Sequence, residues 1–358
     1  MRTAPLAGLA LALSLSAAQA PAAEAPLRVA LIDVEGGAAT LFVTPDGRSL
    51  LVDAGWAAGM GVPPGAPPGP SSADRIVATA KSLGLSRIDY LLISHYHLDH
   101  VGGAPELMAK FPVGTVLDHG PNREAPPAGQ APSPNSAEQL FARYEAAIGQ
   151  RPRQVMKPGD QLTLGPLTFD FVVGDRVVGG RPGAPTPGCE DVASKSQIGG
   201  EENPRSLGFV ASFGEARILN LSDLTWDLEK DLVCPANRLG RIDLMVVSHH
   251  GSDLSNTPTL FAATAPRVAL VGNGARKGGD GPVLERLKAA PSKPAVWQVH
   301  FATRTPDANV AAEQIANLDV QPDAGHLLSA EVTKDGAITV VNGRTGARET
   351  YRPARRQD

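Results

Sequence analysis

The chain lacks the features that mark nucleic-acid-binding and membrane-spanning proteins. Its 358 residues carry a formal net charge of −4, whereas binding to a phosphate backbone depends on clustered Lys and Arg. The arginines that do cluster, at positions 348, 352, 355 and 356, lie at the extreme C-terminus and are typical of a solvated tail. No apolar run beyond the N-terminus is long enough to span a bilayer. We therefore expect a small-molecule substrate and no membrane span; the net charge does not favour a nucleic-acid partner but does not exclude one.

Cysteine is also scarce, with Cys189 and Cys234 as the two that the sequence contains. An oxidising compartment would allow them to pair. Two free buried thiols are the alternative, because a sequence does not place two sulfurs within bonding distance.

The N-terminus has the pattern of a secretory signal peptide. Arg2 supplies a positive start, the segment from Leu6 to Leu15 is apolar, and small residues follow from Ala17 to Ala23. We predict that residues 1–25 are a signal peptide, that residues 26–358 form a single domain, and that the protein is periplasmic or secreted.

The remaining sequence alternates between strand and helix patterns. β-Branched and apolar runs at 27–34, 40–44 and 49–53 predict strands, and the spacing over 74–83 predicts a helix. The near-continuous apolar run at 88–94 is typical of a strand buried on both faces. Residues 174–204 show no pattern and predict a long loop. Early hairpins followed by alternating strands and helices favour mixed sheets covered by helices.

Side chains of the metal-ligand type follow three of the predicted strands. His95, His97, Asp99 and His100 come directly after one strand, Asp223 follows a second, and the pair His249 and His250 follows a third. Strand-end loops of a layered α/β domain gather at one edge. Imidazole and carboxylate together suit zinc, iron or manganese. The sequence therefore predicts a metal site at this edge.

The segment SHYHLDHVGG resembles the HxHxDH signature of metallo-β-lactamase-fold hydrolases. The other landmarks of that family occur in order, as Leu51 to Gly55, Leu221 to Asp223 and Val247 to Ser252. The opening segment from Ile32 to Gly37 and the SHHGS segment are more specifically similar to the hydrolase domain of competence-type DNA-uptake proteins and to phosphorylcholine esterases. The resemblance implies a four-layer αββα sandwich of two mixed β-sheets with a binuclear site between them.

The same resemblance implies a role for each matching residue. His95 and His97 would bind one metal, Asp223 would bridge both, and the second metal would take three further ligands: Asp99, His100 and His250. The metals would be two divalent ions, with Zn favoured over Mn or Fe. Asp99 and His249 would be catalytic, with His249 contacting substrate, and Asp53 would orient ligands from behind.

The sequence departs from the family where a third histidine for the first metal is usual. Glu202 and Asn203 stand there, so Asn203, Glu202 or water would complete that site. We assign four residues to substrate binding: His119, Asn203, Lys277 and His300. Lys277 lies on a Gly-rich loop after a strand, where it would reach an anionic group.

The function expected from this constellation is metal-dependent hydrolysis by a bridging hydroxide. The best-known zinc-dependent lactamases of the family that the chain resembles carry a Cys among the ligands of the second metal, but neither Cys of this chain follows the matching strand, where Asp223 stands. This resemblance favours the esterase and phosphodiesterase relatives. The expected substrate is therefore a phosphoester, either a phosphodiester or a phosphorylated small molecule. Hydrolysis of a lactone or β-lactam is one alternative. A metal-binding module without turnover is the other, since the usual third histidine is missing.

Overall fold

The computed structural model describes residues 24–61, 69–125, 129, 133–195, 200–319 and 324–353. The predicted signal peptide lies almost wholly outside the described residues. Among the described residues, no helix combines the length and apolar character needed to cross a membrane.

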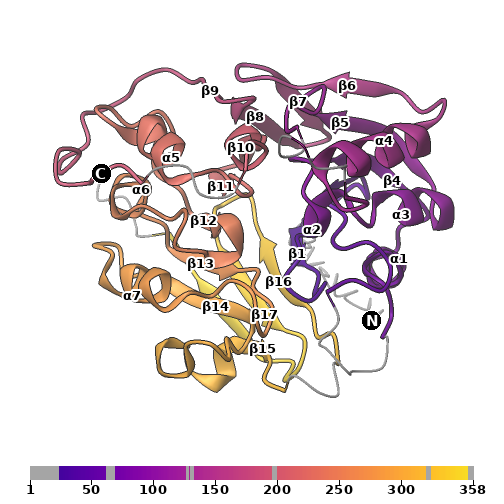
Figure 1. Ribbon diagram of the computed structural model, residues 1–358. Coiled ribbons are helices and arrows are strands. Elements are labelled where there is room, and N and C mark those ends of the chain that lie inside the picture. Colours follow the sequence, from indigo (N-terminus) through magenta and orange to yellow (C-terminus); the bar gives the residue numbers. More distant parts are fainter. Residues whose placement is uncertain are drawn as a thin grey trace, which may run out of the picture.

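The strands of the described residues form two mixed sheets of nine strands each (Figure 1). The first sheet has the order β18-β17-β16-β1-β2-β3-β4-β5-β6. Its strands are β1 (Leu27–Leu31), β2 (Thr40–Val43), β3 (Ser49–Val52), β4 (Ile88–Leu92), β5 (Val113–Asp118), β6 (Arg153–Val155), β16 (Leu328–Val332), β17 (Ile338–Asn342) and β18 (Arg348–Tyr351). The strands from β3 to β6 are parallel neighbours, whereas β1, β2 and the C-terminal strands pair antiparallel.

The second sheet has the order β15-β14-β13-β12-β11-β10-β8-β7, with β9 paired to β8. Its strands are β7 (Gln161–Leu164), β8 (Leu167–Gly174), β9 (Val177–Val178), β10 (Gly208–Phe213), β11 (Ala216–Asn220), β12 (Leu244–Val246), β13 (Val268–Val271), β14 (Ala295–His300) and β15 (Ile315–Asn317). The strands from β11 to β15 run parallel, so the loops after them leave from one edge.

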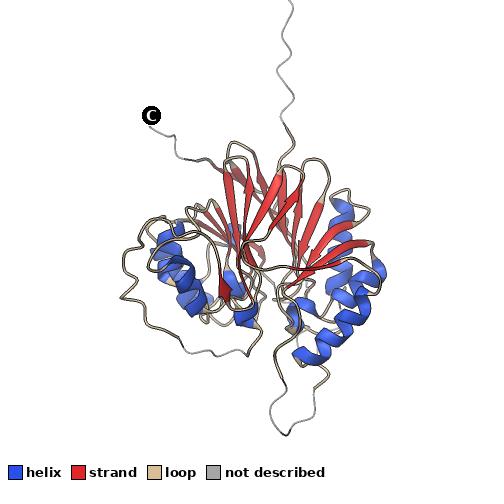
Figure 2. Ribbon diagram, turned by 90° about the horizontal axis from the view of Figure 1, so that it is seen from above, coloured by secondary structure: helices blue, strands red, loops and turns tan. Residues whose placement is uncertain are grey.

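Helices cover the outer face of each sheet (Figure 2). The helices are α1 (Ser72–Ser82), α2 (Leu98–Val101), α3 (Ala104–Lys110), α4 (Ala137–Ile148), α5 (Trp226–Val233), α6 (Pro258–Thr264) and α7 (Gly281–Ala289). Short 3₁₀ segments are η1 (Asn203–Arg205), η2 (Ser248–Gly251), η3 (Pro306–Ala308) and η4 (Ala312–Gln314). Apolar residues of α1, α3 and α4 pack on the first sheet, and those of α5, α6 and α7 pack on the second.

The inner faces of the two sheets share a third apolar core, which contains most of the buried phenylalanines. The ring of Phe42 on β2 meets the rings of Phe169 and Phe209 edge-on, with centroids 5.5 and 5.9 Å apart. Edge-to-face contacts of this kind stabilise aromatic pairs beyond the burial of their area. Helix, sheet, sheet and helix therefore stack in the αββα order, which confirms the predicted fold class.

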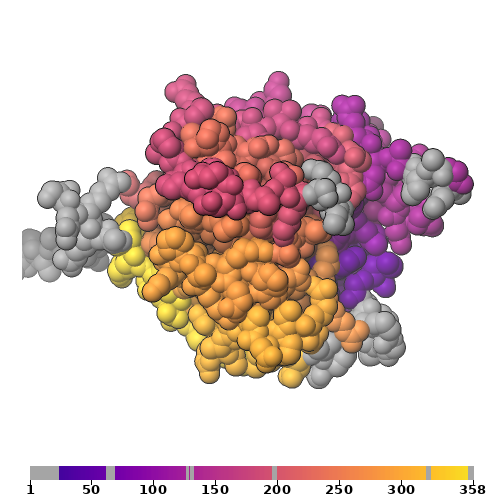
Figure 3. Space-filling view, turned by 60° about the vertical axis from the view of Figure 1, so that its left-hand side comes forward, coloured from indigo at the N-terminus to yellow at the C-terminus, as the bar shows by residue number. Residues whose placement is uncertain are grey.

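The loop predicted over residues 174–204 is more ordered than its sequence indicates. It contains β9 and η1, and Pro185 forms an isolated bridge with Ala236. Cys189 and Cys234 are joined by a disulfide, which settles the pairing that the sequence left open. The indole Nε1 of Trp226 also donates to Ala193 O at 3.0 Å, and Figure 3 shows this part of the chain lying against the orange residues of the helical layer.

Candidate metal centre

Three strand ends bring the predicted ligands together. His95 and His97 leave β4, Asp99 and His100 form the first turn of α2, Asp223 follows β11, and the pair at 249 and 250 lies in η2 after β12. Ligand atoms of four of these residues all lie within 4.8 Å of one another: Asp99, His100, Asp223 and His250. All four are buried, so an ion among them would be largely shielded from water.

The imidazoles of His100 and His250 face each other in this group. Their Nε2 atoms are 3.2 Å apart, and Asp223 Oδ2 lies 3.2 Å from His100 Nε2 and 3.5 Å from His250 Nε2. Asp99 Oδ2 completes the group at 3.1 Å from His250 Nε2. Burial opposes protonation of His100, but the carboxylates of Asp223, Asp99 and Asp53 outweigh it and raise its pKa well above the usual value.

The outer nitrogens show why this arrangement suits a cation. His100 Nδ1 lies 2.8 Å from Asp53 Oδ2, and His250 Nδ1 lies 3.3 Å from the carbonyl oxygen of Gly272. Both partners are acceptors, so each Nδ1 carries a proton and each Nε2 is directed at the two carboxylates. The raised pKa of His100 means that a proton on its Nε2 offsets the carboxylates when no ion is bound. A divalent cation would take the place of that proton in this donor set.

Asp53 lies behind the candidate ligands, and its role in orienting them stays a prediction. Its Oδ1 accepts a hydrogen bond from the Ser94 amide, and its Oδ2 accepts one from Ser94 Oγ, each at 2.8 Å. The same Oδ2 bonds His100 Nδ1. This arrangement fixes the tautomer and the direction of the His100 ring.

His95 and His97 form a second converging pair. His95 Nε2 lies 3.2 Å from His97 Nδ1. Ser94 Oγ donates its hydrogen bond to Asp53, so it accepts a hydrogen bond from His95 Nδ1 at 3.0 Å. Glu124 Oε2 lies 3.6 Å from His97 Nε2 and orients that ring, a contact that the sequence analysis missed. The two inner nitrogens thus present lone pairs toward the place predicted for the first metal.

The two candidates for the missing third ligand differ in what they contact. Glu202 is fully buried, and its Oε2 accepts from the Tyr96 amide at 3.1 Å and lies 3.0 Å from His119 Nε2. The Glu202 carboxylate is therefore already engaged by the Tyr96 amide and by His119. Asn203 is buried beside His249, and its Oδ1 has no hydrogen-bond partner among the described residues. Of the two, Asn203 is the side chain with a free ligand atom.

His119 is buried against the ring of Tyr96, with ring centroids 4.6 Å apart, in addition to its contact with Glu202. In this position it supports the segment between His95 and His97. Its assignment to substrate binding stays a prediction.

His249 also points its Nε2 inward. Ser255 Oγ donates to Leu224 O at 2.6 Å, so at 3.1 Å it accepts the proton of His249 Nδ1. The Nε2 lone pair then faces Asp223 Oδ2 at 3.3 Å. Burial lowers the pKa of His249 to about 4, although Asp223 opposes this, and the imidazole is neutral near pH 7.

Lys277 reaches the centre from the loop between β13 and α7. Its Nζ is in contact with Asp99 Oδ2 and lies 5.1 Å from the centroid of the Trp56 ring. Burial would raise the pKa of the Asp99 carboxyl, but Lys277 and His100 hold it well below its usual range. A positive side chain therefore stands at the rim of an acidic site.

His300 belongs to a different cluster, with Asp33 and Glu35. Its Nε2 lies 2.8 Å from Asp33 Oδ1, and the guanidinium of Arg75 lies 3.5 Å from Asp33 Oδ2. Burial by itself lowers the pKa of His300, but the bond to Asp33 outweighs burial, and the pKa is raised. These cations compensate the Asp33 charge, so we assign no metal to the cluster. The predicted contact of His300 with substrate stays a prediction.

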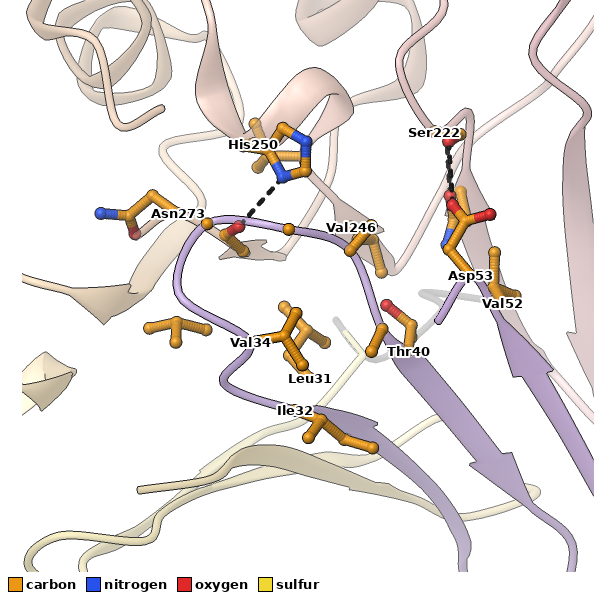
Figure 4. Close-up of a pocket in the computed structure, with 18 of the residues that line it drawn as sticks. Leu31, Ile32, Val34, Thr40, Val52, Asp53, Ser222, Val246, His250 and Asn273 are labelled. Carbon is orange, nitrogen blue, oxygen red and sulfur yellow. Dashed lines mark hydrogen bonds between the residues drawn. The ribbon is translucent and has the colours of Figure 1, made fainter. Parts of the chain in front are cut away.

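A pocket adjoins the metal centre on the side of the segment that follows β1 (Figure 4). Asp223, His249 and His250 line it together with Asp33 and the backbone of residues 36–40. Figure 4 shows His250 at the top of the pocket, Asp53 and Ser222 to its right with Val246 between, and the apolar side chains of Leu31, Ile32 and Val34 below.

The chain is similar to known proteins over part of its length. Residues 32–196 match the family model of the metallo-beta-lactamase superfamily. A segment is 43% identical over 58 residues to a hydroxyacylglutathione hydrolase of Aliivibrio salmonicida, covering 16% of this chain and 22% of that protein. The match therefore spans about a fifth of that relative.

Two solved structures are similar to the chain at low identity. The metallo-beta-lactamase fold protein YhfI from Bacillus subtilis is 14% identical with a TM-score of 0.45, covering 76% of this chain and 96% of that one. A possible metal-dependent hydrolase from Veillonella parvula is 12% identical with a TM-score of 0.40, covering 85% and 99%. The likeness concerns the fold alone.

The two-sheet sandwich is the metallo-β-lactamase fold. The match over residues 32–196 and the buried His and Asp side chains are similar to those of the metallo-beta-lactamase superfamily. The matched segment ends before Asp223, His249 and His250, so the folded geometry, and not the family match, adds these residues to the centre.

Proposed function

We propose that the protein is a binuclear metal-dependent hydrolase that acts on a phosphoester, either a phosphodiester or a phosphorylated small molecule. The observation that carries the substrate class is Lys277, whose ammonium group contacts Asp99 at the rim of the site. A phosphoester brings a negative charge next to buried carboxylates. A cation at the rim compensates the charge of an anionic substrate, whereas a neutral substrate would form no ion pair with it.

A pair of divalent cations in this donor set would supply Lewis-acid activation of the substrate oxygen and of water at neutral pH. The chain's own residues would position the reactants and manage the proton. Asp99 stays ionised because of Lys277 and His100, so its carboxylate can accept a hydrogen bond from water and orient it. The neutral His249 presents its Nε2 beside Asp223, where it can accept a hydrogen bond from substrate or water.

A second candidate is hydrolysis of a carbonyl substrate such as a lactone or β-lactam. The short likeness to a hydroxyacylglutathione hydrolase supports hydrolysis at a carbonyl carbon. The same metal pair would serve that reaction, but Lys277 would then have a smaller role.

The test is a comparison of turnover by the metal-loaded protein on three substrates: bis-p-nitrophenyl phosphate, nitrocefin and a simple lactone. We expect the highest kcat/KM on the phosphodiester. A higher value on the lactone or nitrocefin would favour the second candidate. Bound metal without turnover on a broad ester panel would favour a metal-binding module.

We also propose that the protein is exported to the periplasm or beyond. The disulfide between Cys189 and Cys234 supports this, because such bonds persist in oxidising compartments. The intact mass of the protein from the producing cell should place the mature N-terminus between about residues 20 and 26. Retention of Met1 would contradict the proposal.

A further inference from the structure

Two adjacent histidines of the metal centre have an unusual backbone conformation. His249 has φ of 52° and His250 has φ of 54°, and Gly251 follows at 79°. The left-handed region is unfavourable for a residue other than glycine. Because this conformation turns both imidazoles toward Asp223, something in the surrounding structure must hold it.

The side chain of Asn256 spans the turn that contains these histidines. Its Nδ2 donates to the carbonyl oxygen of Ser248 at 2.9 Å and to that of Ser252 at 3.0 Å. The two acceptors lie on either side of the histidine pair, so one amide group closes the turn. Two carbonyl partners also establish that this end of the side chain is the NH₂ group.

Glu229 on α5 fixes Asn256 in turn. Its Oε2 accepts hydrogen bonds from the amides of Asn256 at 2.6 Å and Thr257 at 2.9 Å. Glu229 and Asn256 are both fully buried, so no water replaces these bonds if the carboxylate is removed. The guanidinium of Arg286 donates to Asn256 O at 2.8 Å and holds the other side of the same residue.

We infer that Asn256, anchored by Glu229, is the positioning residue that keeps His249 and His250 in their left-handed conformation and thereby sets the affinity of the centre for its second metal. The inference rests on the proposed function in one respect, that the centre holds metal ions. Their hydrogen bonds go to backbone groups on either side of the histidine pair and to the amides of residues 256 and 257. Both residues therefore act through the turn that carries the histidines, and losses of this indirect kind weaken metal binding roughly 10- to 100-fold.

The decisive variant is Asn256→Gly. Asn256 has φ of 69°, a conformation that glycine adopts freely, so the substitution removes the two side-chain bonds without straining the backbone. Competition for Zn²⁺ with a chromophoric chelator measures the dissociation constant of the weaker site. We expect it to rise at least about tenfold, with the tighter site little changed. Wild-type affinity in this variant would overturn the inference.

Two further variants separate positioning from general stability. Asp243→Ala removes a carboxylate at the opposite end of β12, where it accepts from Arg217 N at 2.9 Å, so it should lower Tm and leave Zn²⁺ affinity unchanged. Glu229→Gln keeps an acceptor oxygen for both amides and should bind Zn²⁺ as the wild type does, whereas Glu229→Ala should resemble Asn256→Gly. Loss of affinity in Asp243→Ala equal to that in Asn256→Gly would contradict the inference. A wild-type protein that binds no Zn²⁺, Mn²⁺ or Fe²⁺ would instead defeat the proposed function.

Discussion

The Nε2 atoms of His100 and His250 lie 3.2 Å apart, with both opposite ring nitrogens engaged by acceptors. Because the pKa of His100 is raised well above its usual value, its Nε2 holds a proton beside the carboxylates when no ion is bound. A divalent cation would displace that proton and take both Nε2 atoms as ligands. His95 and His97 repeat the pattern at 3.2 Å, which makes them the candidate ligands of a further ion.

Asp223 is the residue whose loss should affect the centre most. Its Oδ2 lies within 3.5 Å of Nε2 in His100, His249 and His250. Asp223→Ala should lose at least one metal per chain and abolish hydrolysis, because two cations would face each other without the carboxylate between them. Metal per chain by plasma mass spectrometry and turnover on bis-p-nitrophenyl phosphate check this. Asp46→Ala serves as the control, because it removes an exposed carboxylate at the turn between β2 and β3. Full metal content and full activity in Asp223→Ala would mean that the centre is misassigned.

Lys277→Ala should weaken binding of anionic substrates selectively. A hydrogen bond to a charged group contributes about 1.5 to 3 kcal/mol, which corresponds to a rise in KM for a phosphodiester of roughly ten- to a hundredfold. KM for a neutral ester should change little. Lys195→Ala is a matched control, because Lys195 also lies over an indole ring, that of Trp226 at 3.9 Å, but pairs with Asp253, which is not a candidate ligand. Equal effects on both substrates would remove Lys277 from charge recognition.

The disulfide should stabilise the segment that leads to Asn203. Cys189 and Cys234 are 45 residues apart, and closing a loop of that size stabilises a protein by roughly 2 to 4 kcal/mol. The double variant Cys189→Ser, Cys234→Ser should therefore unfold at a lower urea concentration than the wild type. Thiol titration of the denatured, unreduced wild type should find no free thiol. Two titratable thiols would show that the bond is absent from the isolated protein.

The sequence predicted the sandwich and the ligand group because both have local signals. The strand patterns at 40–44 and 49–53 correspond to β2 and β3, and the helical spacing at 74–83 corresponds to α1. The HYHLDH segment places its ligands within a few residues of one another, directly after β4.

The supporting contacts have no such signal. Glu124 reaches His97 from a segment outside every strand and helix, and Glu229 on α5 supports Asn256 through two backbone amides. Neither spacing nor residue type distinguishes these glutamates from the many exposed ones. The order within residues 174–204 was missed for a similar reason, since it depends on a disulfide and on contacts with α5 and not on a repeating apolar pattern.

Glu229 should make the stability of the fold depend on pH. Burial raises its pKa from 4.5 to about 7, although the Thr257 and Asn256 amides oppose the rise. A carboxyl whose pKa is higher in the folded state is favoured there as the protonated form. The contribution of Glu229 to the free energy of unfolding is therefore complete below pH 4.5 and is lost as pH rises through about 7.

Glu229→Gln removes this titration while keeping an acceptor for both amides. The variant should gain in stability relative to the wild type between pH 5 and pH 8, by a few kcal/mol at most, since one pKa unit corresponds to about 1.4 kcal/mol. Urea unfolding of both metal-loaded proteins across that range measures the difference, and titrations common to the two proteins cancel. If the difference in free energy of unfolding between the two proteins does not vary with pH, Glu229 stays ionised throughout that range. The hydrogen bonds from the Asn256 and Thr257 amides would then cancel the rise in its pKa that burial causes.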